Sequence, residues 1–429
     1  MSMGIKMNRP LIILVVLGLI APSLAAAHGI PQMRVNCDRG QSVQSVLDRL
    51  TGPATIVVTG TCTENLVIKL NDVTLRGGAY KAYDANQSTI RVLGAQRVLI
   101  TGVNVTGGRI GITATDNSAI ALTNSTITNN TTGVLVTRSS SARIGQDFDG
   151  VAGQIKNMIT ENSSSGVSVS RGSYALIDNN TIDSNSGAGI NLDAASATVT
   201  NNTIQGNKRQ GIVVSNVGNA RIGITEATQP GPNTITNNNF EGIQITNGGS
   251  ASIFANIIQN NGLSTHRPGV GIYEATGQLL GDNTIQGSGG HGVQVSLGTL
   301  FNGAGDWPLT PGPDLITANG YSGISGWNGA HLDIRHVTVT GNTENGIVLS
   351  LQSTLRIYAS TVSGNHLNGI LLYDGSSVAR YGTDSPRDSI TGNLGWGIIC
   401  YGGSNLIGDT SGVDGNTVGE VKCPPINIP

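Results

Sequence analysis

The stretch Asn202-Thr203-Ile204-Gln205-Gly206-Asn207-Lys208-Arg209-Gln210-Gly211-Ile212-Val213-Val214 decides the fold of this chain. It contains an aliphatic residue, an asparagine three positions later and a glycine four positions after the asparagine. The same spacing ends at seven further glycines: Gly166, Gly189, Gly242, Gly323, Gly346, Gly369 and Gly397. Glycines followed by Ile or Val recur from Gly111 to Gly397, Gly271 among them, with a basic spacing of 21–23 residues. Such a period indicates a repeat architecture.

Each repeat has the pattern of three short strands with alternating inward and outward residues. In the repeat quoted above, alternation places inward the side chains of Ile204, Ile212, Val214, Ala220 and Ile222. A unit of this length cannot bury its inner face alone. Stacked on its neighbours, it builds three parallel sheets around a narrow core of small aliphatic residues. The sequence therefore predicts a three-sheet solenoid.

The composition agrees with this prediction. The chain has 429 residues, of which 61 are glycine and only 4% are aromatic, because a narrow core has little room for large rings. Asparagine suits repeating turns, since it tolerates left-handed backbone and its amide can stack into a ladder along the solenoid. The net charge of −2 and the lack of a basic stripe exclude a nucleic-acid partner.

The N-terminus has the three parts of a secretory signal peptide. Lys6 and Arg9 precede an apolar stretch over residues 11–20, and Ala25-Ala26-Ala27 follows. The alternative is a membrane anchor, but the apolar stretch is shorter than the roughly 20 residues that a span requires. We expect residues 1–27 to be removed by cleavage near Ala27. The mature chain is then secreted, periplasmic or on the cell surface, with no membrane span.

The four cysteines lie in two pairs near the ends of the mature chain. In an oxidising compartment we expect disulfides, and pairing within each end closes short loops: Cys37 with Cys62, and Cys400 with Cys423. A metal site is the alternative, but the sequence has no Cys-x-x-Cys and no adjacent histidine pair. We therefore predict no metal ligands.

The remaining chain divides into a cap and a solenoid. Residues 28–55 are expected to cap the open end with a short amphipathic helix that carries Val43, Val46, Leu47 and Leu50 on one face. Residues 56–429 form the solenoid, including its disulfide-linked C-terminal end.

Two segments resemble a known family. Gly60-Thr61-Cys62-Thr63-Glu64-Asn65-Leu66-Val67-Ile68, followed by Val73-Thr74-Leu75-Arg76-Gly77, resembles the opening coils of right-handed parallel β-helix proteins of the pectin-lyase-like superfamily. The Asn-Thr-Ile repeats resemble those of bacterial secreted members. The resemblance implies an all-β, right-handed parallel β-helix, which we expect to have about 13–15 coils. It leaves activity open, because this superfamily includes lyases, galacturonases, epimerases and adhesins.

The known catalytic motifs are incomplete. Gly290-His291-Gly292 matches one galacturonase motif, but the sequence has no Asp-Asp pair and no Arg-Ile-Lys. Glycoside hydrolysis needs two carboxylates across the bond, and no such pair is evident. The lyase motif around a catalytic arginine and the Asp-Pro-His motif of epimerases are not found. We interpret His291 as a turn residue before the repeat glycine.

One strand has an unusual outward face. In His331-Leu332-Asp333-Ile334-Arg335, alternation points the three polar residues outward, and Arg356 and Tyr358 occupy the same columns one coil later. We expect Arg380 to join them after a one-residue bulge. A cation that neutralises a substrate carboxylate, beside a base that removes a proton, is what uronate lyases and epimerases require. The alternative is a solvated face whose charges pair with each other.

Insertions give a second indication of a site. They fall at about 145–158, 223–233, 301–314 and 382–389, all after the same strand of the repeat. Loops aligned along one edge can form the side of a binding groove. Our candidate substrate-binding residues are Asp306, Trp307, whose ring suits stacking on a sugar, and Arg380. The alternative is unconstrained loop growth at a tolerant turn.

These observations support two functions. The first is a monomeric carbohydrate-interacting protein, as a polysaccharide lyase or epimerase with His331, Asp333, Arg335, Arg356 and Tyr358 as catalytic residues. Calcium would be expected only for a lyase, and the sequence contains no metal motif. The second is a non-catalytic surface protein of adhesin-like or structural type. The sequence leaves open whether the protein is an enzyme.

Overall fold

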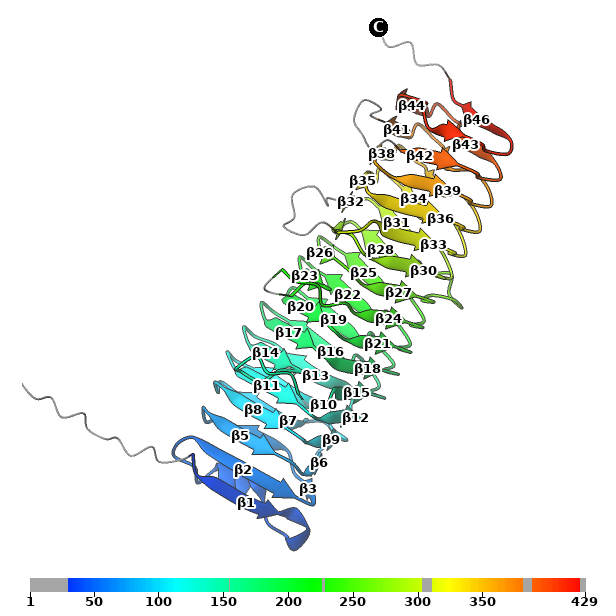
Figure 1. The fold of residues 1–429 in the computed structure, drawn as a ribbon. Coiled ribbons are helices and arrows are strands. Elements are labelled where there is room, and N and C mark those ends of the chain that lie inside the picture. Colours follow the sequence, from blue (N-terminus) through cyan, green and yellow to red (C-terminus); the bar gives the residue numbers. More distant parts are fainter. Residues whose placement is uncertain (1–29, 154, 226–227, 303–310, 381–387, 425–429) are drawn as a thin grey trace, which may run out of the picture.

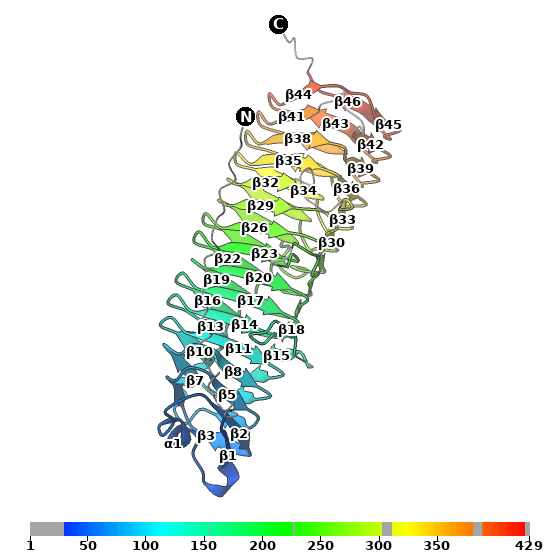
Figure 2. The same cartoon turned by 60° about the vertical axis from the view of Figure 1, so that its left-hand side comes forward.

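The computed structural model describes residues 30–424, except for 154, 226–227, 303–310 and 381–387. The chain winds into an elongated solenoid whose three parallel sheets run along its length (Figure 1, Figure 2). We call them sheets A, B and C, with 16, 15 and 15 strands. The predicted three-sheet β-helix is confirmed. Its number of turns, about 16, is one above the predicted range because the first strand of the cap adds to sheet A.

Within each sheet, hydrogen-bonded neighbours are three strands apart in the sequence. Sheet A consists of β1 (Gln32–Asn36), β2 (Ala54–Thr59), β5 (Val73–Arg76), β8 (Val98–Thr101), β11 (Ala119–Thr123), β14 (Ser141–Ile144), β17 (Tyr174–Asp178), β20 (Ser196–Thr200), β23 (Asn219–Ile222), β26 (Ser250–Ile253), β29 (Thr276–Leu279), β32 (Thr299–Asn302), β35 (His331–Arg335), β38 (Thr354–Tyr358), β41 (Ser377–Arg380) and β44 (Asn405–Gly408).

Sheet B consists of β3 (Thr61–Thr63), β6 (Ala79–Lys81), β9 (Asn104–Thr106), β12 (Thr126–Thr128), β15 (Asn157–Thr160), β18 (Asn180–Asp183), β21 (Thr203–Gln205), β24 (Thr234–Thr236), β27 (Ile257–Gln259), β30 (Thr284–Gln286), β33 (Asp314–Thr317), β36 (Val337–Thr340), β39 (Thr361–Ser363), β42 (Ser389–Thr391) and β45 (Val413–Asp414).

Sheet C consists of β4 (Leu66–Ile68), β7 (Ser88–Leu93), β10 (Ile110–Thr115), β13 (Thr132–Val136), β16 (Val167–Ser170), β19 (Ile190–Asp193), β22 (Ile212–Ser215), β25 (Ile243–Thr246), β28 (Val270–Tyr273), β31 (Val293–Ser296), β34 (Ile324–Trp327), β37 (Ile347–Leu349), β40 (Ile370–Leu372), β43 (Trp396–Cys400) and β46 (Gly419–Lys422).

The core is one continuous cluster of buried aliphatic side chains that runs from the first strand to the last coil. The inward residues predicted from alternation are all at most 1% exposed: Ile204, Ile212, Val214, Ala220 and Ile222. Each packs on its register partner in the next coil, so the sheets share one hydrophobic interior.

Asparagine has two structural roles that fall on adjacent residues. Asn201 adopts the left-handed conformation (φ 57°). The next residue, Asn202, is buried and donates its side-chain amide to Asn233 Oδ1 at 3.0 Å, within a ladder at the corner between sheets A and B. A second ladder follows the corner between sheets B and C. Its rungs join Asn130, Asn162, Asn185, Asn207, Asn238 and Asn261, and then Asn319, Asn342, Asn365, Asn393 and Asn416.

The N-terminal cap is mostly not helical. β1 pairs in parallel with β2, a 3-10 turn η1 (Cys37–Arg39) follows, and the helix α1 (Val43–Leu47) has five residues, so Leu50 lies beyond it. Glu64 fixes the start of the helix, because its carboxylate accepts hydrogen bonds from the backbone N–H of Val43 and Gln44 at 2.9 and 3.1 Å.

Both predicted disulfides are present, Cys37 with Cys62 and Cys400 with Cys423. The predicted signal peptide lies outside the described residues. Among the residues that are described, no helix has the length and apolar character needed to cross a membrane.

All four insertions follow strands of sheet A, namely β14, β23, β32 and β41, and therefore leave the same corner of the solenoid, as predicted. Antiparallel bridges, Gln146 with Ala152 and Ile224 with Pro230, organise the first two. Ile224 packs on Phe254 and Leu280 in a small hydrophobic cluster separate from the main core.

Candidate functional site

An extra segment interrupts the repeat in the middle of sheet C. In the preceding coil the ladder asparagine, Asn238, and the repeat glycine, Gly242, are four positions apart, and in the following coil Ser288 and Gly292 keep this spacing. Asn261 and Gly269 are instead eight positions apart. The register pairs Val270 with Ile243, so Gly269 occupies the repeat position, and the assignment of Gly271 to it from sequence is wrong. The extra residues bring His266 and Arg267 to the corner between sheets B and C.

Gly271 instead makes room for the side chain of Tyr273. Its register partners are Gln244 and Gln294, which lie on the outer face of sheet C. The ring of Tyr273 folds back across this glycine, because a Cβ atom on Gly271 would lie 2.7 Å from the Tyr273 hydroxyl oxygen. Only glycine leaves room for this position of the ring. The hydroxyl oxygen of Tyr273 thereby comes within 3.3 Å of Glu241 Oε1 and of Gln294 Oε1.

Glu241 is a carboxylate with 1% of its surface exposed. Gln210 Nε2 donates to its Oε2 at 3.2 Å, and Arg267 Nη1 lies 3.8 Å from its Oε1. A buried charge is tolerated only when it is paired and hydrogen-bonded, and these neighbours supply both conditions. Burial first, and then the charge of Glu241, raise the pKa of the Tyr273 hydroxyl well above its usual range, so Tyr273 is a protonated donor at neutral pH.

Two histidines lie in the neighbouring coils. The ring of Tyr321 stacks on His266 with centroids 5.8 Å apart and meets the edge of His291 at 5.4 Å. His291 Nδ1 accepts a hydrogen bond from the backbone N–H of Ser322 at 3.2 Å. Burial lowers the pKa of His291 to about 4, so the ring is neutral and carries its hydrogen on Nε2. We refer to Gln210, Glu241, Arg267, Tyr273, His291 and Tyr321 as the Glu241 cluster.

The Glu241 cluster combines a cation and a protonated phenol beside a buried carboxylate, with the neutral imidazole of His291 in the next coil. These are the groups needed to hold a carboxylate and to move a proton at the carbon beside it. From sequence, His291 is expected to be a turn residue only, and Glu241, Arg267 and Tyr273 are missed. The signal that could have found them is the long Asn261–Gly269 spacing.

The structure also brings together five residues predicted from sequence, which we call the His331 face: His331, Asp333, Arg335, Arg356 and Tyr358. The register pairs Asp333 with Arg356 and Arg335 with Tyr358 across β35 and β38, as alternation predicted. Asp333 is 8% exposed, because Arg335 and Arg356 cover it. Arg335 Nε and Arg356 Nη1 lie 3.7 and 3.5 Å from its two oxygens. His331 Nδ1 contacts Thr354 Oγ1 at 2.7 Å.

The predicted position of Arg380 is wrong. No bulge is present, and the register pairs Arg380 with Ile357, which lies in the inward column rather than on the His331 face. Its guanidinium donates to the carbonyl oxygens of Asp409 and Ser411 at 2.8 and 3.0 Å and lies 3.7 Å from Asp388. Because the side chain is 3% exposed, Arg380 holds the final coils together instead of facing solvent. Asp306 and Trp307 lie outside the described residues.

Among the described residues, one group of three metal-ligand side chains has its ligand atoms close together: Cys37, Cys62 and Glu64. Both sulfurs belong to a disulfide, and Glu64 binds the start of α1, so this group does not fit a metal ion.

Comparison with known proteins defines the class. The family model described as the right handed beta helix region matches residues 54–194, 88–228 and 188–302, which together span more than half of the chain. The chain therefore belongs to this family of right-handed β-helix proteins. None of the curated proteins matches it significantly.

Several solved structures share the fold. The A-module of mannuronan C-5 epimerase AlgE4 from Azotobacter vinelandii is 12% identical, with 88% of this chain and 91% of that chain covered and a TM-score of 0.37. A mutant of the periplasmic alginate epimerase AlgG is 14% identical, with 87% and 84% covered and a TM-score of 0.43. An alginate lyase from Paenibacillus sp. str. FPU-7 is 11% identical, with 92% and 99% covered and a TM-score of 0.29. At these identities the likeness shows the fold alone.

Proposed function

We propose that this protein is exported and acts on an acidic polysaccharide, as a uronate lyase or epimerase, with the Glu241 cluster as its active site. One observation carries the proposal: Tyr273 is held protonated across Gly271 and against the buried carboxylate of Glu241, with Arg267 at the same carboxylate. The two disulfides support an oxidising compartment outside the cytoplasm.

The geometry supports a proton relay. Arg267 binds the substrate carboxylate and stabilises the charge that develops when the proton on C5 leaves. The oxygen of Tyr273 takes that proton while its own proton moves to Glu241. In β-elimination the C4–O bond breaks, a C4–C5 double bond forms, and the relay returns the proton to the leaving oxygen. In epimerisation C5 instead receives a proton from a water molecule on its opposite face, and the hydroxide that remains takes up the proton held by Glu241, so that every side chain returns to its starting state.

The test uses the purified mature protein with polygalacturonate, alginate and glycosaminoglycans. A lyase gives the ultraviolet absorbance of an unsaturated uronate, and an epimerase gives an NMR-detectable change in sugar configuration without cleavage. Tyr273→Phe is expected to lower the turnover rate by roughly 100-fold or more, since general acid–base groups contribute factors of this size. Tyr358→Phe, which removes the equivalent hydroxyl from the His331 face, is the matched control.

The His331 face is a second candidate site for the same function, because its two half-exposed guanidiniums share a single carboxylate and leave a net positive charge. If Arg356→Gln abolishes turnover and Tyr273→Phe does not, the active site lies on the His331 face. If no polymer is converted and none binds, the proposal fails and the non-catalytic surface protein is the better description.

A further inference from the structure

Sheet C has a second polar feature nearer its N-terminal end. A hollow of about 520 Å³ lies over its outer face between β7 and β19. Four arginines of successive coils line it. Arg91 lies within β7, Arg109 directly precedes β10, and two follow strand ends, namely Arg138 after β13 and Arg171 after β16. We call this the arginine hollow. It lies on the same sheet as the Glu241 cluster.

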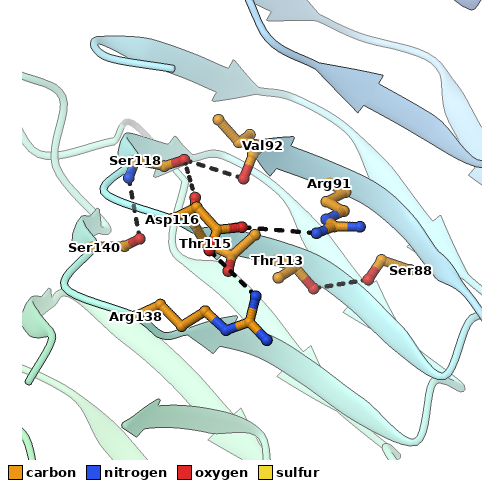
Figure 3. A network of polar contacts seen from close by, with 9 residues as sticks. All are labelled: Ser88, Arg91, Val92, Thr113, Thr115, Asp116, Ser118, Arg138 and Ser140. Carbon is orange, nitrogen blue, oxygen red and sulfur yellow. Dashed lines mark hydrogen bonds and ion pairs between the residues drawn. The ribbon is translucent and has the colours of Figure 1, made fainter. Parts of the chain in front are cut away.

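Two of the four arginines in the hollow share one carboxylate, which leaves one positive charge between them unbalanced. Figure 3 shows Asp116 between Arg91 and Arg138, whose guanidinium nitrogens lie 3.8 and 3.2 Å from its oxygens. Arg109 and Arg171 are exposed and form no ion pair within the part of the chain that the structure describes. With Asp193 included, four arginines face two aspartates, in a chain whose net charge is −2.

The floor of the hollow consists largely of small hydroxyl side chains. Ser88 Oγ lies 2.8 Å from Thr113 Oγ1, as Figure 3 shows, and Ser170 Oγ donates to Thr137 Oγ1 at 3.0 Å. The lining has no aromatic ring on which a nucleobase could stack. Hydroxyl groups beneath guanidiniums instead suit a ligand that carries both hydroxyls and anionic groups.

The hollow and the Glu241 cluster are spaced for one extended ligand. From β13, beneath the hollow, to β25, which Glu241 precedes, there are four strand steps, or about 19 Å at the usual separation of roughly 4.8 Å. The sheet between them is continuous.

We infer that the arginine hollow is an auxiliary binding site for the anionic groups, carboxylate or sulfate, of a long acidic glycan whose chain extends along sheet C to the Glu241 cluster. The choice of glycan rests on the proposed function, but the hollow contributes to binding and not to bond chemistry. The arginine hollow makes the affinity for the glycan depend on chain length. A short oligomer bound at the Glu241 cluster does not reach Arg109 and Arg171.

The test measures binding by fluorescence anisotropy with end-labelled tetramers and dodecamers of alginate, polygalacturonate and a heparin fragment. The double variant Arg109→Gln/Arg171→Gln is expected to weaken dodecamer binding by roughly tenfold or more. It should also reduce the dependence on salt and leave tetramer binding and tetramer turnover unchanged. Arg76→Gln/Arg97→Gln removes two exposed charges elsewhere and is expected to bind as the wild type does.

Unchanged dodecamer binding by the double variant overturns the inference, as does an equal loss of tetramer and dodecamer binding. Tighter binding of single-stranded DNA than of any glycan also overturns it. The separate measurements distinguish the two proposals. Length-dependent binding that the double variant loses, in a protein without turnover, supports the hollow and rejects the proposed catalysis. Turnover with normal dodecamer binding by the double variant does the opposite.

Discussion

At the scale of single residues, the chemistry of this solenoid lies where the repeat is broken. Tyr273 can reach the buried Glu241 only because position 271 has no side chain. The register partners of Gly271 in the adjacent coils, Gln244 and Gln294, show that the solenoid accepts large side chains at this position. The glycine is therefore a requirement of the Tyr273 position and not of the fold.

Gly271→Ala tests this dependence. The new methyl group would lie 2.7 Å from the phenol, so the ring must leave Glu241 while the strand stays in place. We expect turnover to fall about as far as in Tyr273→Phe, on the order of 100-fold, with an unchanged far-ultraviolet circular dichroism spectrum. Ser325→Ala, in the same column, is the control. Full activity of Gly271→Ala would show that the position of Tyr273 does not matter.

His291 gives the fold a dependence on pH. Burial holds the pKa of its imidazole at about 4, below the usual value of 6.5. Between these values the unfolded chain binds a proton that the native protein does not, so stability falls as the pH falls through this window, by on the order of 2–3 kcal/mol. We expect the thermal midpoint of the wild type to drop more between pH 7 and 4 than that of His291→Gln. His366→Gln, at an exposed position, should follow the wild type, and parallel curves for all three would contradict the assignment.

At the scale of elements, the turn between sheets B and C is held by its asparagine ladder. Asn207 accepts hydrogen bonds from the backbone N–H and the amide of Asn185 and donates to Asn238, with no exposed surface. The ladder is broken at Ser288, whose buried hydroxyl oxygen has no hydrogen-bond partner among the described residues. The break adjoins the long Asn261–Gly269 turn. The turn that carries His266 and Arg267 therefore lies next to a rung that lacks its side-chain hydrogen bonds.

Ser288→Asn is expected to repair the ladder. Its side-chain oxygen would accept from Asn261, and its amide would donate to Asn319, whose oxygen already accepts from the backbone of residue 288 at 3.1 Å. Each recovered hydrogen bond contributes about 1 kcal/mol, so we expect a gain of about 1–2 kcal/mol in the free energy of unfolding, measured in urea. Asn207→Ser, the reverse change at an intact rung, should destabilise. A loss of stability in Ser288→Asn would show that the turn, and not the ladder, dictates this position.

At the scale of the whole molecule, the sequence predicted what depends on period and alternation. The sheets, the inward Ile and Val columns and the pairing of Asp333 with Arg356 follow from equal coil lengths. Arg380 was misplaced because the prediction assumed a bulge before it, whereas uninterrupted alternation along β41 puts it in the inward column. The Glu241 cluster was missed because it depends on two departures from the repeat. The turn before β28 is longer than usual, and the ring of Tyr273 folds back over Gly271 of its own strand.

The solenoid has two ends, and each carries one disulfide. Because each coil contacts only its neighbours, the terminal coils have the fewest stabilising contacts and open first. Cys37 with Cys62 ties the cap to β3, and Cys400 with Cys423 ties β43 to the segment after β46. The disulfides therefore act on the ends, at a distance from the Glu241 cluster.

Cys400→Ser/Cys423→Ser tests this division. A disulfide that closes a loop of this size contributes about 2–4 kcal/mol, and we expect that loss to be confined to the last coils. Hydrogen exchange should quicken at β44, β45 and β46, while β25 and β28 keep their protection and tetramer turnover is unchanged. Cys37→Ser/Cys62→Ser should instead quicken exchange at β1 and β3. If either pair of substitutions quickens exchange at β25 and β28 as much as at the terminal strands, the solenoid unfolds as one cooperative unit. The ends, and not the local contacts of each coil, would then determine the stability of the Glu241 cluster.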